Sequence, residues 1–246
     1  MRKTTFGTFF ELGGRGAMES LSRTGLDYVI IDTEHGCFSE ESTADLILAA
    51  ERGGLLPYVR IGDIRRPYVL RMLDIGARGL IVPQIHSATE VRELIAHAKF
   101  PPLGKRGYCP NRMTGWGADD WSKDVLHYMD ECNRRCKLIP QCETRGALEE
   151  IEEIAALPGV DGIFVGPFDL STAMGIPGEF DRPEFKDALR HIAGVCRAAG
   201  KPTLIFAGST AAAREDLAMG YDIIAYSMDA SLLIEAGRTA IREILA

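Results

Sequence analysis

The chain has 246 residues, 46% of them hydrophobic, with a formal net charge of −7 from 28 basic and 35 acidic residues. This length allows one large α/β domain spanning 1–246, and the acidic balance without a basic stripe argues against nucleic-acid binding. No apolar run approaches the ~18 residues of a membrane span, and segment 1–7 has no signal-peptide pattern, so we expect a cytoplasmic protein.

Eight short apolar runs are predicted to be β-strands: 5–12, 27–32, 56–60, 79–83, 137–142, 161–165, 202–206 and 222–226. Hydrophobic residues at helical spacing predict helices between most of them, at 43–52, 67–75, 88–98, 147–157, 185–199 and 210–219. This alternation predicts a (β/α)8 TIM barrel. The alternative is an open doubly wound sheet, but no dinucleotide fingerprint follows the first strand, and the glycine cluster 13–16 is interpreted as a flexible loop.

One long segment, 100–128, interrupts the alternation with prolines, glycines and both tryptophans. Long insertions in compact domains are often functional, so this one is expected to form a lid or subunit contact on the catalytic face. The alternative is a variable loop packed by its own aromatic residues.

The six cysteines show no paired CxxC spacing. Cys132 and Cys136 lie four residues apart, on one predicted helix face. We interpret them as free thiols of a reducing compartment, with a zinc site as the weaker alternative.

Two predicted strands end close to a single carboxylate. Glu143 follows the strand at 137–142, and Asp169 follows the strand at 161–165. A helix joins the two strands, so they form a parallel crossover and end at the same edge of the sheet. The two carboxylates are therefore expected side by side, as ligands of a hard divalent cation, unless they are unrelated loop acids.

Other candidate side chains are placed by the same pattern. His35 follows the second strand and could act as a base near neutral pH, or be a solvated loop histidine. Arg60 ends the third strand and could stabilise an oxyanion, or form a structural salt bridge. Asp74 ends a helix, away from the catalytic rim of its own subunit, where a surface acid is the simple interpretation. Exposed amides before Asp169 could bind an anion, and the whole set suits chemistry on a 2-oxo acid.

The chain resembles the HpcH/HpaI aldolase family, the class II, metal-dependent pyruvate aldolases. The resemblance lies in ordered motifs at 27–36, 57–60, 72–83, 101–107, 140–144 and 158–171, and in the tail at 220–229. It implies a (β/α)8 barrel in a homo-hexamer (a dimer of trimers), with a C-terminal helix exchanged between subunits. It also implies cleavage of a 4-hydroxy-2-oxo acid to pyruvate and an aldehyde, and the reverse condensation.

Residue roles follow from the resemblance, starting with metal and substrate. Glu143 and Asp169 would bind Mg²⁺, Mn²⁺ or Co²⁺. Gln141 would contact the substrate. The pyruvyl carboxylate would bind the amides around Gly166, Pro167 and Phe168.

The resemblance also implies a set of catalytic side chains. Arg60 would stabilise the pyruvate enolate. His35, supported by Asp32, would act through water as the base for the C4 hydroxyl. Asp74 of a neighbouring subunit would complete this base system.

Cys142 and Phe168 depart from the residues that are common in the family, which leaves the aldehyde open. No lysine ends a strand where a Schiff-base aldolase would need one. Two alternatives remain: an acyl-CoA lyase of the malyl-CoA or citryl-CoA type on the same fold, and a non-catalytic binding protein.

Overall fold

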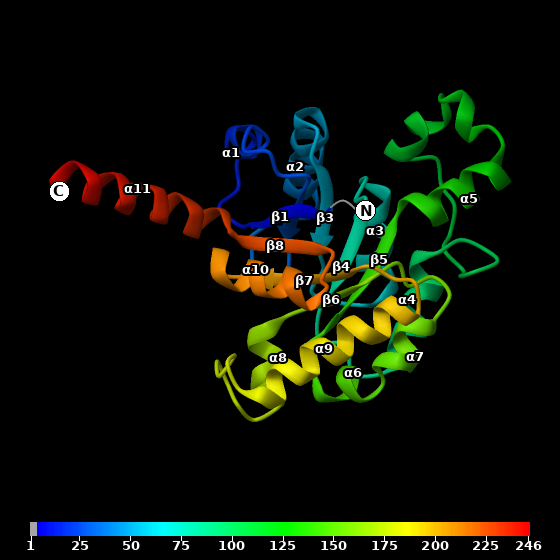
Figure 1. Ribbon diagram of the computed structural model, residues 1–246. Helices are drawn as coiled ribbons and strands as arrows, with labels where there is room; N and C mark the ends of the chain where they lie inside the picture. The colour runs from blue at the N-terminus through cyan, green and yellow to red at the C-terminus, as the bar shows by residue number, and fades with distance from the viewer. Residues whose placement is uncertain (1–3) are drawn as a thin grey trace.

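A closed barrel of eight parallel strands in sequence order forms the centre of the computed structural model, which describes residues 4–246 (Figure 1). The strands are β1 (Thr5–Phe10), β2 (Tyr28–Asp32), β3 (Leu56–Arg60), β4 (Gly79–Val82), β5 (Lys137–Cys142), β6 (Ile163–Val165), β7 (Thr203–Ala207) and β8 (Ile223–Met228). Strand β1 pairs with both β2 and β8, which closes the barrel. The predicted (β/α)8 barrel is confirmed. The prediction that segment 1–7 has no signal-peptide pattern includes residues 1–3, which lie outside the described residues.

Helices surround the barrel, and α11 extends away from it (Figure 1). They are α1 (Arg15–Leu21), α2 (Glu40–Gly53), α3 (Arg66–Asp74), α4 (Ala88–Ala98), α5 (Val125–Arg135), α6 (Arg145–Glu149), α7 (Ile151–Ala156), α8 (Pro167–Ala173), α9 (Pro183–Ala198), α10 (Thr210–Met219) and α11 (Asp229–Leu245). Two 3₁₀ turns, η1 (Arg112–Gly117) and η2 (Asp120–Ser122), precede α5.

Two local predictions were wrong. The single helix predicted at 147–157 is two helices, because Glu150 leaves helical geometry with φ −107° and ψ 19°. The glycine cluster interpreted as a flexible loop is a loop only at Gly13 and Gly14, because Gly16 lies within α1. Gly13 and Gly14 take positive φ values of 81° and 88°, which glycine adopts without steric cost, and so turn the chain from β1 into this helix.

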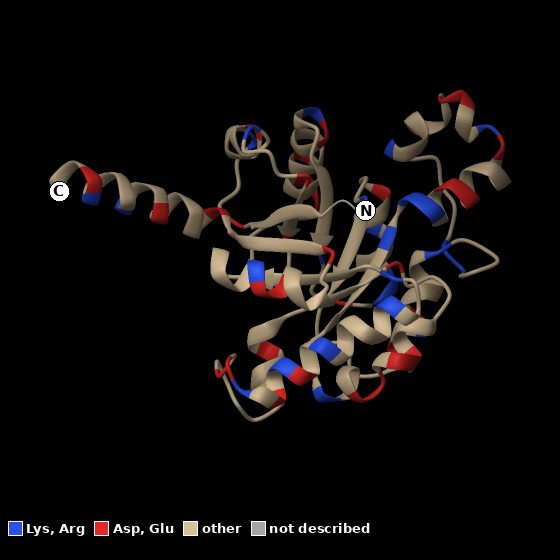
Figure 2. Ribbon diagram, viewed as in Figure 1, with Lys and Arg blue, Asp and Glu red and all other residues tan. Residues whose placement is uncertain are grey.

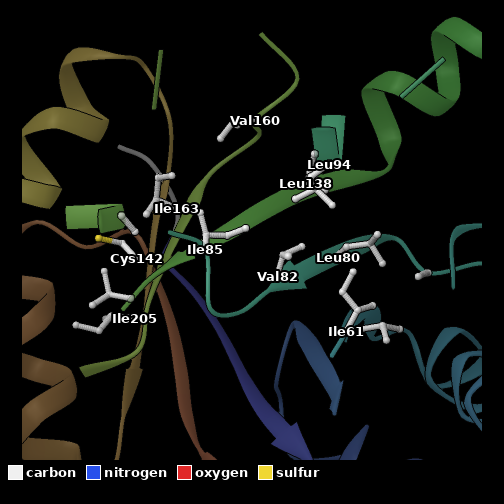
Figure 3. Packing of buried hydrophobic residues seen from close by; sticks show 14 of the residues in the cluster. Ile61, Leu80, Val82, Ile85, Leu94, Leu138, Cys142, Val160, Ile163 and Ile205 are labelled. Atoms are coloured by element: carbon white, nitrogen blue, oxygen red, sulfur yellow. The ribbon is translucent and has the colours of Figure 1, made fainter. Parts of the chain in front are cut away.

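The strands are mostly apolar because both of their faces are largely buried. Inward-pointing side chains fill the barrel, and they include Phe9, Tyr28, Ile30, Ile81, Ile139, Phe164, Leu204 and Ala225. Outward-pointing side chains such as Val82, Leu138, Ile163 and Ile205 belong to the layer that packs against the helices (Figure 3). The two layers fix the strand ends, and with them the rim that carries the polar side chains.

The insertion after α4 was predicted on the catalytic face, but it lies at the opposite end of the barrel. It connects α4 to α5 and β5, and helix-to-strand connections in a (β/α)8 barrel lie at the amino-terminal end of the strands. Phe100, Tyr128 and Cys132 form a small separate core there, against which Trp121 packs. The placement on the catalytic face was therefore wrong, although the aromatic packing expected of a variable loop is present. Figure 1 shows this segment and α11 leaving the barrel on opposite sides.

Among residues 4–246, no helix is long and apolar enough to cross a membrane. Figure 2 shows basic and acidic residues interspersed over the helices rather than separated onto different faces.

A buried carboxyl on α10 is expected to make the stability of the fold depend on pH. Asp216 is only 6% exposed. Burial raises its pKa to about 7; the charge of Glu215 adds to this shift and that of Lys186 opposes it. Because the folded-state pKa lies above the unfolded value of ~3.9, the folded protein binds the proton more tightly. The contribution of Asp216 to stability is therefore fully present below about pH 4 and is lost as the pH rises through about 7.

Asp216→Asn removes this ionisation while keeping the shape of the side chain. We expect it to raise the free energy of unfolding at pH 8 by about 2–4 kcal/mol and to change it little at pH 4. Urea unfolding at both pH values measures this. Asp187→Asn, on the exposed side of α9, is the control and should have little effect at either pH. A gain of the same size at both pH values would contradict the assignment.

Candidate active site

A cavity of about 190 Å³ opens at the carboxyl ends of the strands. Its walls are Phe9, Glu11, His35, Arg60, Gln141, Glu143, Phe164, Gly166, Pro167, Phe168, Asp169, Phe206 and Met228. Most of the sequence-predicted site residues therefore meet here. Asp32 lies buried beneath the cavity, bonded to Arg60, and Asp74 does not belong to it.

Glu143 is held rigidly at the bottom of this cavity. Its Oε1 accepts hydrogen bonds from the backbone N–H of Gln84 at 2.8 Å and from Gln84 Nε2 at 3.2 Å. Its Oε2 accepts from Gln141 Nε2 at 2.6 Å. Gln84 takes a φ of 51°, a left-handed conformation that is uncommon outside glycine, and its N–H reaches the carboxylate. A Cβ at Gly166 would lie 2.4 Å from Glu143 Oε2, so only glycine fits there.

The residues present fit a divalent cation. Burial raises the pKa of Glu143 to about 7; the Gln84 N–H opposes the shift and the charge of Asp169 adds to it. The buried Glu143 and the more exposed Asp169 thus repel each other across the cavity, and a cation between them would offset this repulsion. Within residues 4–246, no cluster of three or more His, Cys, Asp or Glu side chains suits a metal. A cation bound here would keep positions for substrate oxygens and water, as Mg²⁺ sites commonly do.

Arg60 lines the same cavity as Glu143 and connects it to a network of acids. Its Nε lies 2.9 Å from Asp32 Oδ1 and 3.3 Å from Glu34 Oε2, and its Nη2 pairs with Asp32 Oδ2. Its guanidinium lies over the Phe9 ring, 4.6 Å from the centroid. Burial alone would raise the pKa of Asp32, but the hydrogen bonds and charge of Arg60 hold it below its ordinary value. The salt bridge considered as an alternative is therefore present, on a side chain that also lines the cavity.

His35 lies at the mouth of the cavity, with its side chain 69% exposed. Its Nε2 is 3.8 Å from Glu34 Oε2. Asp32 Oδ1 instead accepts the backbone N–H groups of Glu34 and His35, at 3.1 and 3.4 Å. Asp32 therefore orients the loop that carries His35, whereas Glu34 is the carboxylate that faces the imidazole. Burial raises the pKa of Glu34, and the charges of Arg60 and His35 oppose this shift.

Asp74 lies at the amino-terminal end of the barrel, at the last residue of α3. Its Oδ1 accepts hydrogen bonds from Arg106 Nη2 at 2.8 Å and Asn111 Nδ2 at 3.0 Å. Both donors come from the insertion after α4. The structure thus holds this carboxylate in one orientation, outside the cavity of its own chain.

Sequence reasoning missed Glu11, which lines the cavity just after β1. Its backbone N–H donates to Asp229 Oδ1 at 3.0 Å, and burial, followed by the neighbouring Asp32, raises the pKa of its carboxyl. The first strand was predicted to run to Leu12, so Glu11 was counted as a strand residue. The rule that identified Glu143, an acid just beyond a strand end, would have found it.

A closed (β/α)8 barrel with its charged cavity at the carboxyl ends of the strands is the arrangement of barrel enzymes. The sequence model of the HpcH/HpaI aldolase/citrate lyase family matches residues 6–236, and the chain belongs to this family. The family predicted from the sequence motifs is thereby confirmed.

Relatives of the chain carry the names of aldolases, which are carbon–carbon lyases. The chain is 37% identical over 235 residues to hydroxypyruvate/pyruvate aldolase of Chromohalobacter salexigens, covering 95% of this chain and 90% of that protein. It is 32% identical over 220 residues to 2-keto-3-deoxy-L-rhamnonate aldolase of Klebsiella pneumoniae, covering 89% and 80%. The crystal structure of a family member from Burkholderia cenocepacia superposes with a TM-score of 0.92 at 32% identity, covering 100% and 96%.

Proposed function

We propose that the protein is a class II aldolase, which uses a divalent metal ion to cleave a 4-hydroxy-2-oxo acid to pyruvate and an aldehyde and catalyses the reverse condensation. The observation that carries the proposal is the buried Glu143, which lines one cavity together with Asp169, Arg60 and His35. The names of the relatives, a hydroxypyruvate/pyruvate aldolase and a 2-keto-3-deoxy-L-rhamnonate aldolase, support this class of reaction.

Metal and substrate would bind on the β5–β6 side of the cavity. Glu143 and Asp169 would hold Mg²⁺, Mn²⁺ or Co²⁺, and such an ion polarises the 2-oxo group and stabilises enolate charge. Gln141 would contact the substrate through Oε1, which is buried without a hydrogen-bond partner among the described residues. The amides of Gly166 and Phe168 would donate to the pyruvyl carboxylate, whereas Pro167 has no N–H and only shapes the turn.

Proton transfer would take place on the β2–β3 side. His35 would take the C4 hydroxyl proton through water, and the nearby Glu34 carboxylate would stabilise the imidazolium. Arg60 would stabilise the oxygen that gains negative charge as the enolate forms. Asp74 would complete the base system in the site of a neighbouring subunit.

We propose a homo-hexamer, a dimer of trimers in which α11 is exchanged between subunits. On α11 the side chains of Leu233, Ile234, Ile241, Ile244 and Leu245 are all more than half exposed. Apolar surfaces of this kind commonly mark protein interfaces. A cytoplasmic location is also proposed, since all six cysteines are free.

Charges placed on α11 are expected to dissociate the assembly. Ile241→Asp combined with Ile244→Asp would bury two unpaired carboxylates in the proposed interface. Size-exclusion chromatography with light scattering should therefore show a smaller species. Arg238→Asp, at an exposed polar position of the same helix, is the control and should keep the parent mass. An unchanged mass for the double variant would contradict helix exchange.

Metal removal tests the proposed function directly. Protein treated with EDTA should release no pyruvate from a panel of 4-hydroxy-2-oxo acids until Mg²⁺ or Mn²⁺ is added. Glu143→Gln should lower kcat by about 10³-fold, because the site loses an anionic metal ligand. Glu184→Gln, an exposed acid on α9, should leave kcat unchanged. If folded, metal-loaded protein releases no pyruvate from any member of the panel, the proposal is wrong, and malyl-CoA and citryl-CoA would be assayed next.

A further inference from the structure

A second cavity, of about 230 Å³, adjoins the catalytic one. Pro167, Phe168 and Phe206 form part of the wall of both cavities. The other walls of this side chamber come from β7, α9, α10 and the loops beside them: Phe180, Phe185, Lys186, Leu189, Ile205, Gly208, Ala212, Glu215, Asp216 and Met219. A group attached to a substrate in the catalytic cavity could therefore extend into the side chamber.

Aromatic rings line the side chamber from its mouth to its buried end. Phe168 is 63% exposed at the rim, and its ring centroid lies 6.4 Å from that of Phe180. Phe180 in turn lies 5.6 Å from Phe185, which is 1% exposed. An apolar cavity of about 150 Å³ is large enough to bind benzene. The side chamber is therefore large enough for a substituted phenyl ring, and its rings offer edge-to-face contacts to such a guest.

The chamber also holds one carboxyl that has no hydrogen-bond partner in the described part of the chain. Lys186 and Glu215 form an ion pair with each other. Asp216 is 6% exposed, and among residues 4–246 no hydrogen-bond donor to its carboxyl offsets the effect of burial. Its carboxyl oxygens are not sealed inside the protein, because Asp216 borders the chamber, so a ligand group in the chamber can donate a hydrogen bond to them.

We infer that the side chamber binds the apolar, ring-sized end of the aldehyde portion of the substrate, with a hydroxyl group on the ring bonded to Asp216. The inference rests on the proposed function, since it assigns the chamber to the substrate of that reaction. A sugar-derived aldehyde would fit poorly, because its hydroxyl groups would lose water against phenylalanine side chains. The substrate class is therefore an aryl-substituted aldehyde with a short alkyl chain that spans the shared wall.

The first experiment compares the addition of pyruvate to 3-phenylpropanal and to propanal, which lacks the ring. We expect the parent protein to prefer 3-phenylpropanal by about 10–100-fold in kcat/KM, the range that apolar pocket contacts commonly give. Ala212→Phe, which fills the chamber, should remove this preference through KM and leave propanal unaffected. Ala211→Phe makes the same change at the neighbouring exposed position of α10 and should keep it. Equal values for the two aldehydes, or equal losses in both variants, would overturn the inference.

Asp216 is tested with 3-(4-hydroxyphenyl)propanal. The added hydroxyl should raise kcat/KM about 10-fold in the parent protein, and Asp216→Leu should abolish that gain while 3-phenylpropanal still reacts. Asp216→Asn keeps an acceptor oxygen and should retain most of the gain. A hydroxyl gain that survives in Asp216→Leu would remove Asp216 from the site.

Two measurements separate a failure of this inference from a failure of the proposed function. Exchange of the pyruvate methyl protons in D₂O with metal present reports enolate formation without any aldehyde. Binding of 3-phenylpropan-1-ol, followed by saturation-transfer NMR, reports on the chamber without turnover. Exchange without alcohol binding overturns the chamber assignment alone. If the alcohol binds to the parent protein and to Ala211→Phe but not to Ala212→Phe, the ring site is supported. This holds even if pyruvate shows no proton exchange, a result that would refute the aldolase function.

Discussion

Replacing Arg60 by alanine is expected to lower kcat for pyruvate release by about 10³-fold, the loss typical of removing an oxyanion-stabilising donor. The same change should destabilise the folded protein by about 3 kcal/mol, because it leaves a buried carboxylate without its partner. Asp32 is fully buried and receives two hydrogen bonds from the Arg60 guanidinium. Steady-state kinetics and urea unfolding of the same preparation measure the two effects.

Arg60→Lys separates the two roles of this side chain. Lysine keeps the charge but cannot donate two parallel hydrogen bonds to Asp32, so we expect an intermediate loss of about 10–100-fold in kcat. Arg71, an exposed arginine paired with Glu40 at 2.6 Å, provides the control. Arg71→Ala should change kcat and stability little, since exposed ion pairs contribute about 0–1 kcal/mol. Full activity in Arg60→Ala, with folding intact, would refute the assignment of Arg60 to the enolate.

The barrel could be predicted because its strands are buried on both faces and its helices on one. Continuous apolar runs such as that of β2 and helical spacing such as that of α4 are local signals, and each predicted strand lies within two residues of the observed one at both ends. The break at Glu150 depends on one residue leaving helical geometry, which the hydrophobic pattern of 147–157 does not reveal.

The insertion after α4 was predicted at the wrong end of the barrel because it was treated as the loop that directly follows the fourth strand. A helix intervenes, and each passage through a helix reverses the end of the barrel at which the chain emerges.

The site was predictable where a residue directly follows a strand, as Glu143 and His35 do. The partners of these residues were less accessible, because hydrogen-bond geometry is three-dimensional. The pairing of Asp32 with Arg60 joins positions 28 residues apart on neighbouring strands β2 and β3. The side chamber was invisible in the sequence, since Phe168, Phe180 and Asp216 come together only through the packing of α8, α9 and α10.

Mixed assemblies are expected to show that each active site uses residues of two subunits. His35→Ala and Asp74→Ala should each lower kcat by about 10²-fold when every subunit carries the change, since each removes part of the general base system. Co-expressed in equal amounts, the two variants should recover activity at about one quarter of the sites, the share in which an intact His35 meets an intact Asp74 of its neighbour. If Asp74 acted in its own chain, no site would contain both intact residues.

The surroundings of Asp74 favour the outcome in which Asp74 acts in the active site of a neighbouring subunit. Arg106 and Asn111 fix its carboxylate at the end of the barrel opposite the cavity. Beside it lies a hollow of about 800 Å³, partly lined by Trp116 and Trp121, which could receive the rim of another subunit.

A mixture of His35→Ala with Glu143→Gln is the matched control for this experiment. Both side chains line one cavity of one chain, so mixing subunits cannot restore a complete site, and no recovery is expected. Recovery in this control would mean that subunits contribute to the cavity in some other way. Absence of recovery with Asp74→Ala, in assemblies shown by mass to contain both variants, would return Asp74 to the role of a surface acid. His35 would then depend on Glu34 of its own chain, the carboxylate that lies 3.8 Å from its imidazole.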